Sequence, residues 1–410
     1  MVLAVLVPLV VFLASEPVYS STGRHRGTPA NTTRQAVTTT TTTAVKTGEP
    51  TSVGTTSSTS ETSDPHVQAP APAAAAPAPA AAPTTTTTTT APPSDSAQFG
   101  MSAPELLGDT AAQVTAAVNA MASIGLKWVR VDADWDYIQP TSASSFDWSA
   151  TDQVVLAADA AHMNVDLLID ASPAWANSSD SGGTFTEPAS ATAFATFAGE
   201  VAARYGPLGV HAYEIWNEEN TQAFWLPTPD PSFYTSMLKD SYAAIKAAEP
   251  DSTVISGGLS PATTDGTDYS PIDFLTDMYA AGAAGSFDAL GFHAYSYPAL
   301  PDTPESWSGW SQMDQTSPSI RSVMAANGDG LKQVWITEVG APSDGPDGVG
   351  TAAQAEEITQ VVESAKASPW IGETFFYTYQ DSATDPDYFG LLNADGSQKP
   401  AWAALAAALG

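Results

Sequence analysis

The chain has 410 residues, a formal net charge of -32 and no cysteine. A surface this acidic repels nucleic acid and anionic lipid, which excludes a nucleic-acid-binding function and is compatible with a neutral substrate. Because no disulfide can form, a folded domain has to be held together by its core alone.

Composition divides the chain into three segments. Residues 1–20 contain an apolar run at 2–14, which is shorter than the roughly 20 residues that span a bilayer. This predicts a secretory signal peptide, with a short membrane anchor as the alternative. Residues 21–96 are mostly Thr, Ala, Pro and Ser without aromatic residues, which predicts a disordered linker. Residues 97–410 have a size that suits one folded domain, so we expect an exported protein, either free or tethered to a wall or membrane.

From Gln98 onward, short apolar runs alternate with amphipathic stretches, the pattern of β/α units. Strands are expected at 99–100, 127–131, 165–170, 211–216, 253–257, 289–294, 333–337 and 374–379. Helices are expected at 110–124, 152–161, 194–205, 234–245 and 401–409. Eight strands separated by helices predict a (β/α)8 TIM barrel as a single domain. A dinucleotide-binding fold would need a Gly-rich turn after the first strand, which Phe99-Gly100-Met101-Ser102 does not supply.

Two of the expected strands end in a carboxylate. The strand at 211–216 leads into Asn217 and Glu218, and the strand that begins at 333 leads into Glu338. In a parallel barrel the active site lies at the C-terminal strand ends. Two carboxyl groups presented there are the groups that cleave a glycosidic bond, one as proton donor and the other as nucleophile or base. Glu214 and Glu219 compete with Glu218 for its role.

Several short motifs extend this pattern over the whole folded part. They are Lys127-Trp128-Val129-Arg130 followed by Phe146-Asp147-Trp148, Ser172-Pro173-Ala174-Trp175, Gly291-Phe292-His293-Ala294-Tyr295, Phe389-Gly390-Leu391-Leu392 and Lys399-Pro400-Ala401-Trp402. With these motifs in this order, residues 98–409 resemble a retaining glycoside hydrolase of clan A, nearest in pattern to family 39 and to the cellulase-type enzymes of family 5.

The resemblance implies that Glu218 is the acid/base and Glu338 the nucleophile. Asn217 would hold the sugar 2-hydroxyl, a contact that tightens as the oxocarbenium ion forms. Arg130 would lie beneath Glu338 and keep it ionised. A buried ion pair within the barrel is the alternative role for Arg130, and the two roles are compatible.

The resemblance also implies that Tyr295 donates a hydrogen bond to Glu338 and that His293 lines the same subsite. The sequence departs from the family at two positions. No Trp ends the eighth strand, so we expect Tyr379 to supply the sugar platform. Glu219 replaces the usual Pro after the acid/base, where it would raise the pKa of the acid or contact the substrate.

Tryptophans in the loops after the strands are candidate sugar platforms, because sugars stack on aromatic faces. The candidates are Trp135, Trp175, Trp225, Trp307 and Trp310, and we expect about half of them to serve loop packing instead. No metal site or other cofactor is expected, since the histidines lack paired spacing. Asp265, Asp268 and Asp273 lack the order of a calcium loop.

The sequence thus predicts a monomeric, exported glycosidase that cleaves a β-linked polysaccharide with retention and has no integral membrane domain. A non-catalytic carbohydrate-binding barrel tethered to the wall is the alternative, and it predicts the loss of one catalytic carboxylate. A barrel with another hydrolase or lyase chemistry would need a metal cluster or a Lys at a strand end.

Overall fold

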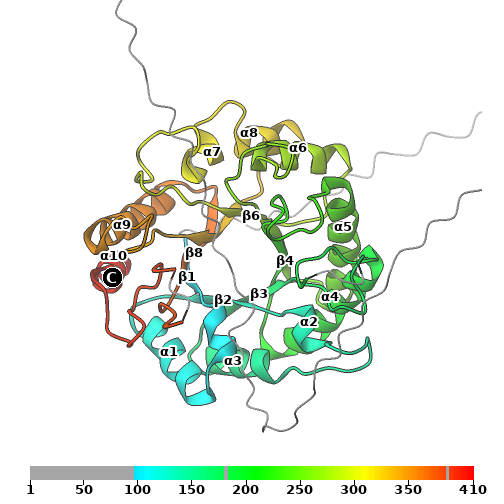
Figure 1. Cartoon of the computed structure of the whole chain (residues 1–410), viewed down its shortest axis with the longest axis horizontal. Helices are drawn as coiled ribbons and strands as arrows, with labels where there is room; N and C mark the ends of the chain where they lie inside the picture. The colour runs from blue at the N-terminus through cyan, green and yellow to red at the C-terminus, as the bar shows by residue number, and fades with distance from the viewer. Residues whose placement is uncertain (1–96, 180–182, 385–386) are drawn as a thin grey trace, which may run out of the picture. The chain divides into compact units, whose positions relative to one another are not determined.

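Eight parallel strands form the centre of the described part of the chain (Figure 1). The computed structural model describes residues 97–179, 183–384 and 387–410, so the predicted signal segment and linker lie outside the described residues. The strands are β1 (Phe99–Ser102), β2 (Trp128–Asp132), β3 (Asn164–Ile169), β4 (Ala212–Asn217), β5 (Thr253–Gly258), β6 (Leu290–His293), β7 (Val334–Val339) and β8 (Ile371–Tyr377).

The strands pair in the order β5-β4-β3-β2-β1-β8-β7-β6. The two outer strands of this order meet through parallel bridges between Ile255 and Ala289 and between Leu259 and Phe292. The sheet therefore closes, and the predicted TIM barrel is confirmed. Closure gathers all C-terminal strand ends at one mouth.

Helices surround the strands (Figure 1). They are α1 (Ala111–Ser123), α2 (Trp135–Ile138), α3 (Ser149–Ala160), α4 (Ala191–Tyr205), α5 (Pro231–Ala248), α6 (Pro271–Ala280), α7 (Gly309–Asp314), α8 (Ile320–Ala326), α9 (Thr351–Ala367) and α10 (Pro400–Leu409), with the 3-10 turns η1 (Pro104–Gly108) and η2 (Gly206–Leu208). The sequence marks several of their ends. Thr110 closes a capping box on α1, and Asp230 caps α5 just before Pro231 at its first position.

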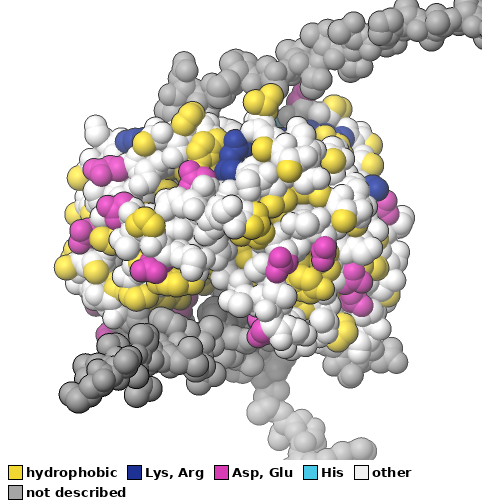
Figure 2. Space-filling view, turned by 90° about the horizontal axis from the view of Figure 1, so that it is seen from above, with side chains coloured by type: hydrophobic (Ala, Val, Ile, Leu, Met, Phe, Trp, Pro, Cys, Tyr) yellow, Lys and Arg dark blue, Asp and Glu magenta, His cyan; other side chains and the backbone are white. Residues whose placement is uncertain are grey.

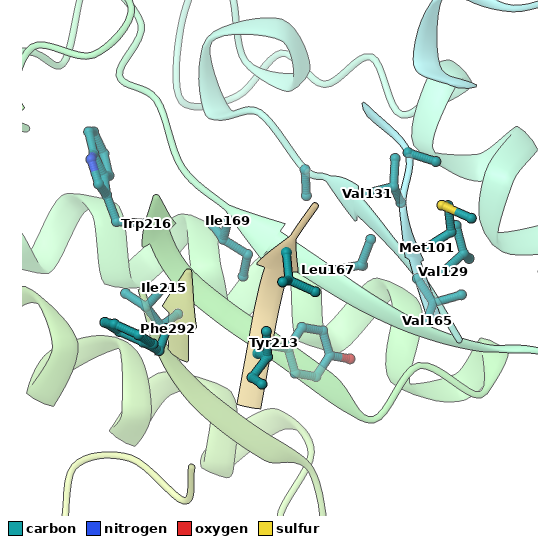
Figure 3. Close-up of a cluster of buried hydrophobic side chains, with 14 of the residues drawn as sticks. Met101, Val129, Val131, Val165, Leu167, Ile169, Tyr213, Ile215, Trp216 and Phe292 are labelled. Atoms are coloured by element: carbon teal, nitrogen blue, oxygen red, sulfur yellow. The ribbon is translucent and has the colours of Figure 1, made fainter. Parts of the chain in front are cut away.

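The barrel has a core on each side of its sheet. Outward side chains such as Val129, Leu167 and Phe292 pack beneath the helices (Figure 3). Inside, a smaller cluster fills the N-terminal end of the barrel. It contains Ala212, Ile255, Ala289, Trp335 and Phe375, with Trp128 packed against it. This apolar plug leaves the polar inward positions to the mouth.

The charge of the chain is visible on its surface. Figure 2 shows one face of the molecule, where Asp and Glu side chains lie at many separate positions and Lys and Arg at few. Among the residues that the structure describes, no helix combines the length and the apolar character that a membrane crossing requires.

Several carboxyl groups are wholly or partly buried outside the mouth of the barrel. Glu357 of α9 is 2 % exposed, and burial raises its pKa to about 8. Burial also raises the pKa of Glu105 and of Glu373 to about 7. The unfolded chain loses these protons near the ordinary value of 4.5, whereas the folded chain keeps them to pH 7 or 8. Their contribution to stability is thus fully present below pH 4.5 and is lost as the pH rises toward 8.

We expect the free energy of unfolding to fall between pH 4.5 and pH 8, the range set by Glu357. Glu357→Gln removes one ionisable group and should reduce this fall by an amount on the order of a few kcal/mol. Urea unfolding across this pH range measures it. The exposed neighbour Glu356 provides the control, as Glu356→Gln should leave the slope nearly unchanged. Equal slopes for wild type and Glu357→Gln would contradict the prediction.

Candidate active site

One buried guanidinium organises the polar part of the barrel interior. Arg130 points inward from β2, and its Nε lies 2.5 Å from Glu214 Oε2. Nη1 donates to Glu338 Oε1 at 2.7 Å and to Ser102 Oγ at 3.0 Å, and Nη2 donates to Asn217 Oδ1 at 2.9 Å. Arg130 thereby connects β1, β4 and β7 across the barrel.

The charges around Arg130 are unequal in number. Glu214 and Asp166 are both fully buried beside the guanidinium. Burial and the charge of Glu214 raise the pKa of Asp166 well above its ordinary value, although Arg130 opposes the shift. A protonated Asp166 removes one negative charge from beside the guanidinium, so that Arg130 is shared by two carboxylates, Glu214 and Glu338, rather than by three.

Glu338 is held as an anion at the mouth. Its side chain is 13 % exposed, and Tyr295 donates its hydroxyl hydrogen to Oε2 at 2.7 Å. Burial alone would raise the pKa of Glu338, but the charges of His293 and Arg130 and the bonds from Tyr295 and Arg130 outweigh it and lower the pKa. The carboxylate is therefore ionised and available as a nucleophile near neutral pH.

Glu218 lies opposite and shares a histidine with Glu338. His293 Nδ1 is 2.8 Å from Glu218 Oε1 and 3.7 Å from Glu338 Oε2. Those two oxygens can thus be at most about 6.5 Å apart, the sum of the two distances. Burial would lower the pKa of His293, but the two carboxylates raise it. Glu218 is 15 % exposed, so both carboxyl groups can be reached from solvent.

Local breaks in strand regularity bring these groups together. β4 leaves extended geometry at Trp216, with φ of 70°, and the chain turns again at Glu218, with φ of 48°. Trp216 points outward (Figure 3) and packs against Phe194 and Trp225, while Asn217 contacts Arg130 and Glu218 contacts His293 at the mouth. In the same way, a register shift between β6 and β7 places His293 opposite Glu338.

The two competing glutamates lie elsewhere. Glu214 is deep in the barrel and bound to Arg130. Glu219 is fully buried against Gly257, so the expectation that it contacts substrate is wrong. The turn at Glu218 causes this, because it directs consecutive side chains to the mouth and to the interior.

Comparison with known proteins assigns the chain to a family. Residues 87–372 match the family model Cellulase (glycosyl hydrolase family 5). The chain belongs to glycosyl hydrolase family 5. This family consists of glycoside hydrolases. A search of curated proteins found no match to this family 5 chain.

Solved structures share the fold of this family 5 enzyme. A family 39 glycoside hydrolase from Bacteroides cellulosilyticus WH2 matches with a TM-score of 0.59 and 20% identity, over 77% of this chain and 64% of that one. A monomeric β-xylosidase from Caulobacter crescentus CB15 matches at 0.56 and 20%, over 76% and 67%. GH5_18 from Streptomyces cattleya, in complex with GlcNAc, matches at 0.55 and 20%, over 77% and 80%. The match thus spans less than two thirds of the Bacteroides chain.

The tryptophans of the family 5 domain fall into two groups. Trp175 and Trp307 are 39 % and 42 % exposed and are available as platforms. Trp135, Trp225 and Trp310 are buried in loop packing. The prediction of Trp135 as a substrate contact is wrong, because its ring stacks on Phe197 and its Nε1 donates to Gln139.

The predicted platform Tyr379 lies beyond β8 and is partly buried, and its ring packs edge-on against Trp402 of α10 with centroids 5.9 Å apart. β8 ends two residues earlier, at Tyr377. Parallel pairing places Tyr377 opposite Ser102, which faces the interior, so Tyr377 is the inward residue at this strand end. Alternation from Phe375 places Tyr377 and Tyr379 on the same face, so the sequence carries no signal that separates them; the end of β8 does.

Aromatic rings that the sequence did not single out as platforms support the mouth. Phe389 lies 5.7 Å from Tyr295, 5.5 Å from Tyr297 and 5.6 Å from Tyr377 between ring centroids. The Tyr377 hydroxyl donates to Asp387 Oδ2 at 3.1 Å. This cluster fixes the ring of Tyr295 and hence its bond to Glu338.

In the described ranges 97–179, 183–384 and 387–410, no group of three His, Cys, Asp or Glu side chains is arranged to hold a metal ion. The buried Lys399 does not supply a strand-end amine. It lies before α10 and binds Asp381 at 2.8 Å.

We expect Arg130→Met to destabilise the fold at neutral pH by about 3 to 5 kcal/mol, because Glu214 and Glu338 would remain buried without their cation. At low pH the loss should shrink as Glu338, whose pKa Arg130 helps to lower, takes up a proton. Urea unfolding at the two pH values measures both effects. Arg204→Met breaks the surface pair with Asp152 and should cost only about 1 kcal/mol. Equal losses for the two variants would contradict the prediction.

Proposed function

We propose that this family 5 enzyme cleaves β-linked glycosides with retention of configuration, through Glu338 as nucleophile and Glu218 as acid/base. The observation that carries the proposal is that Glu218 Oε1 and Glu338 Oε2 lie 2.8 Å and 3.7 Å from the same atom, His293 Nδ1. The distance between these two oxygens is therefore at most about 6.5 Å. Retaining enzymes hold the carboxyl groups about 5 to 5.5 Å apart, whereas inverting enzymes need about 6.5 to 9.5 Å for a water molecule.

In the first step an oxygen of Glu338 bonds to the anomeric carbon. The bond to the leaving oxygen breaks, and that oxygen takes the proton of Glu218. In the second step Glu218 removes a proton from water, and the hydroxide oxygen displaces Glu338 from the sugar. The lowered pKa of Glu338 supports its role as the ionised partner.

Asn217 and the aromatic residues are proposed to bind the sugar. The bond from Arg130 to Asn217 Oδ1 fixes the amide and leaves its NH2 group to donate to the 2-hydroxyl. Tyr377 and Trp175 are the proposed stacking platforms. The acidic surface favours a neutral glycan over an anionic one. The shared fold with the β-xylosidase from Caulobacter crescentus supports a β-linkage.

We further propose that residues 1–20 direct export and that residues 21–96 carry the 97–410 domain at a distance from a wall or membrane. A polymeric substrate outside the cell is consistent with such a spacer. A non-catalytic binding barrel is disfavoured, since both carboxylates are present and both are partly exposed.

Glu338→Gln should lower kcat on any glycoside that the wild type cleaves on the order of 1,000-fold or more, because an amide cannot form the glycosyl ester. A screen of aryl β-glycosides and neutral polysaccharides measures it. Glu356→Gln on the exposed face of α9 is the control and should match wild type. Activity of Glu338→Gln equal to wild type would remove the assigned nucleophile.

Glu218→Ala should lose about 100- to 10,000-fold on substrates with poor leaving groups, since these need a proton from the acid. Aryl glycosides with good leaving groups should still complete the first step, and azide should restore turnover by attacking the glycosyl enzyme. Burst kinetics with and without azide measure this. Unchanged activity without azide rescue would contradict the assignment of Glu218.

A further inference from the structure

Glu219 is a buried carboxyl group that the proposed reaction does not use. Its side chain is 0 % exposed, although it directly follows the proposed acid/base. Neither of its oxygens has a hydrogen-bond partner among the described residues, and a methyl group on Gly257 would overlap Oε2. A carboxylate would pay a large desolvation penalty in this position.

Tyr234 of α5 is the polar group beside Glu219. Its hydroxyl accepts from Gly257 N at 2.7 Å and donates to Ile215 O at 2.9 Å, so it bridges β4 and β5. A tyrosine hydroxyl has one hydrogen to donate, and Ile215 uses it. An ionised Glu219 would therefore not receive this hydrogen from Tyr234. A protonated Glu219 could instead donate its own hydrogen to the second lone pair of the Tyr234 oxygen.

The surrounding charges also favour the neutral form. Glu214 and Glu218 approach Glu219 from β4 and from the turn that follows it, and Tyr234 approaches from α5. β5 contributes Gly257, which has no side chain to titrate. His293 from β6 is bound to Glu218, and Arg130 is bound to Glu214 and Glu338. In agreement, burial raises the pKa of Glu219 to about 8, and the neighbouring carboxylates add to the shift; the Glu219 amide and the Tyr234 hydroxyl oppose it but are not in hydrogen-bonding geometry with the carboxyl group.

The position of Glu219 matters because the adjacent turn is strained. Glu218 has φ of 48°, a conformation that costs a non-glycine residue about 1 to 3 kcal/mol. The turn is held by Glu218 N, which donates to Gly258 O at 3.2 Å, and by Thr221 N, which donates to Glu218 O at 2.9 Å. The Glu219 side chain, seated against Gly257, is a third attachment of this turn to β5.

We propose that Glu219 is a positioning residue: as a neutral carboxylic acid it donates a hydrogen bond to Tyr234 and fixes the turn from which Glu218 acts. The inference rests on the proposed role of Glu218. It assigns to Glu219 no contact with substrate, only the placement of the residue that has one.

The test compares Glu219→Gln with Glu219→Met at about pH 5.5, well below the pKa of about 8. Both side chains are close in size to Glu, but only Gln keeps a donor for Tyr234. Glu219→Met should lower kcat about 10- to 100-fold with little change in KM, because Glu218 is misplaced. Glu219→Gln should stay within a few-fold of wild type. Above pH 8, Glu219→Gln should lose less activity than wild type does, since it cannot ionise.

Glu357 supplies the matched control, because it is a buried carboxyl group with the same raised pKa outside the mouth. Glu357→Met and Glu357→Gln should change the pH dependence of unfolding without changing kcat. The inference is overturned if Met serves as well as Gln at position 219, which would mean that Glu219 only fills space. It is also overturned if Gln is as poor as Met, which would mean that the carboxylate charge is required.

A separate measurement distinguishes this inference from the proposed function. If Glu218→Ala and Glu338→Gln remain fully active, the proposed function fails, but the proton on Glu219 can still be detected without activity. The infrared spectrum of wild type should then contain a protonated-carboxyl band that is absent from Glu219→Gln. Absence of that band from the wild-type spectrum below pH 8 would contradict a neutral Glu219.

Discussion

The hydrogen-bonded ion pairs of Arg130 are the interaction on which the mouth of the barrel depends. One guanidinium contacts Glu214, Glu338, Asn217 and Ser102, which come from three other strands. An arginine suits this position because its planar group offers several donors in fixed directions and remains charged when buried. Its charge keeps Glu338 ionised, and its geometry fixes the amide of Asn217. The contacts of Arg130 that hold the strands together are therefore also the contacts that prepare Glu338 and Asn217.

A second constraint is that the mouth requires irregular backbone. A regular β4 would alternate its side chains and could not place both Asn217 and Glu218 at the mouth. The left-handed conformations of Trp216 and Glu218 break that alternation. Such conformations persist when packing and hydrogen bonds over-determine them. The outward packing of Trp216 and the burial of Glu219 against Gly257 provide this support.

The buried carboxyl groups give the protein a common response to pH. Glu219 and Glu357 hold protons in the fold well above the pH at which they would lose them in an unfolded chain. Glu338 behaves in the opposite way, because cationic neighbours lower its pKa. The difference between these groups comes from their partners rather than from their depth of burial. A single interior thus contains both neutral acids and a stable carboxylate.

The sequence by itself determined the barrel, the order of its strands and the two strand-end carboxylates, because these follow from local periodicity and from motif order. It also identified Arg130, Tyr295 and His293 as their neighbours through resemblance to a family. Only the tertiary structure decided which consecutive residues face the mouth, as at Glu218 and Glu219. It likewise placed Tyr377 as the inward residue at the end of β8 and buried Trp135. These outcomes depend on where a strand ends and on which ring fills which gap. Contacts between residues far apart in the chain determine the strand end and the packing of the rings. A local sequence pattern does not record such contacts.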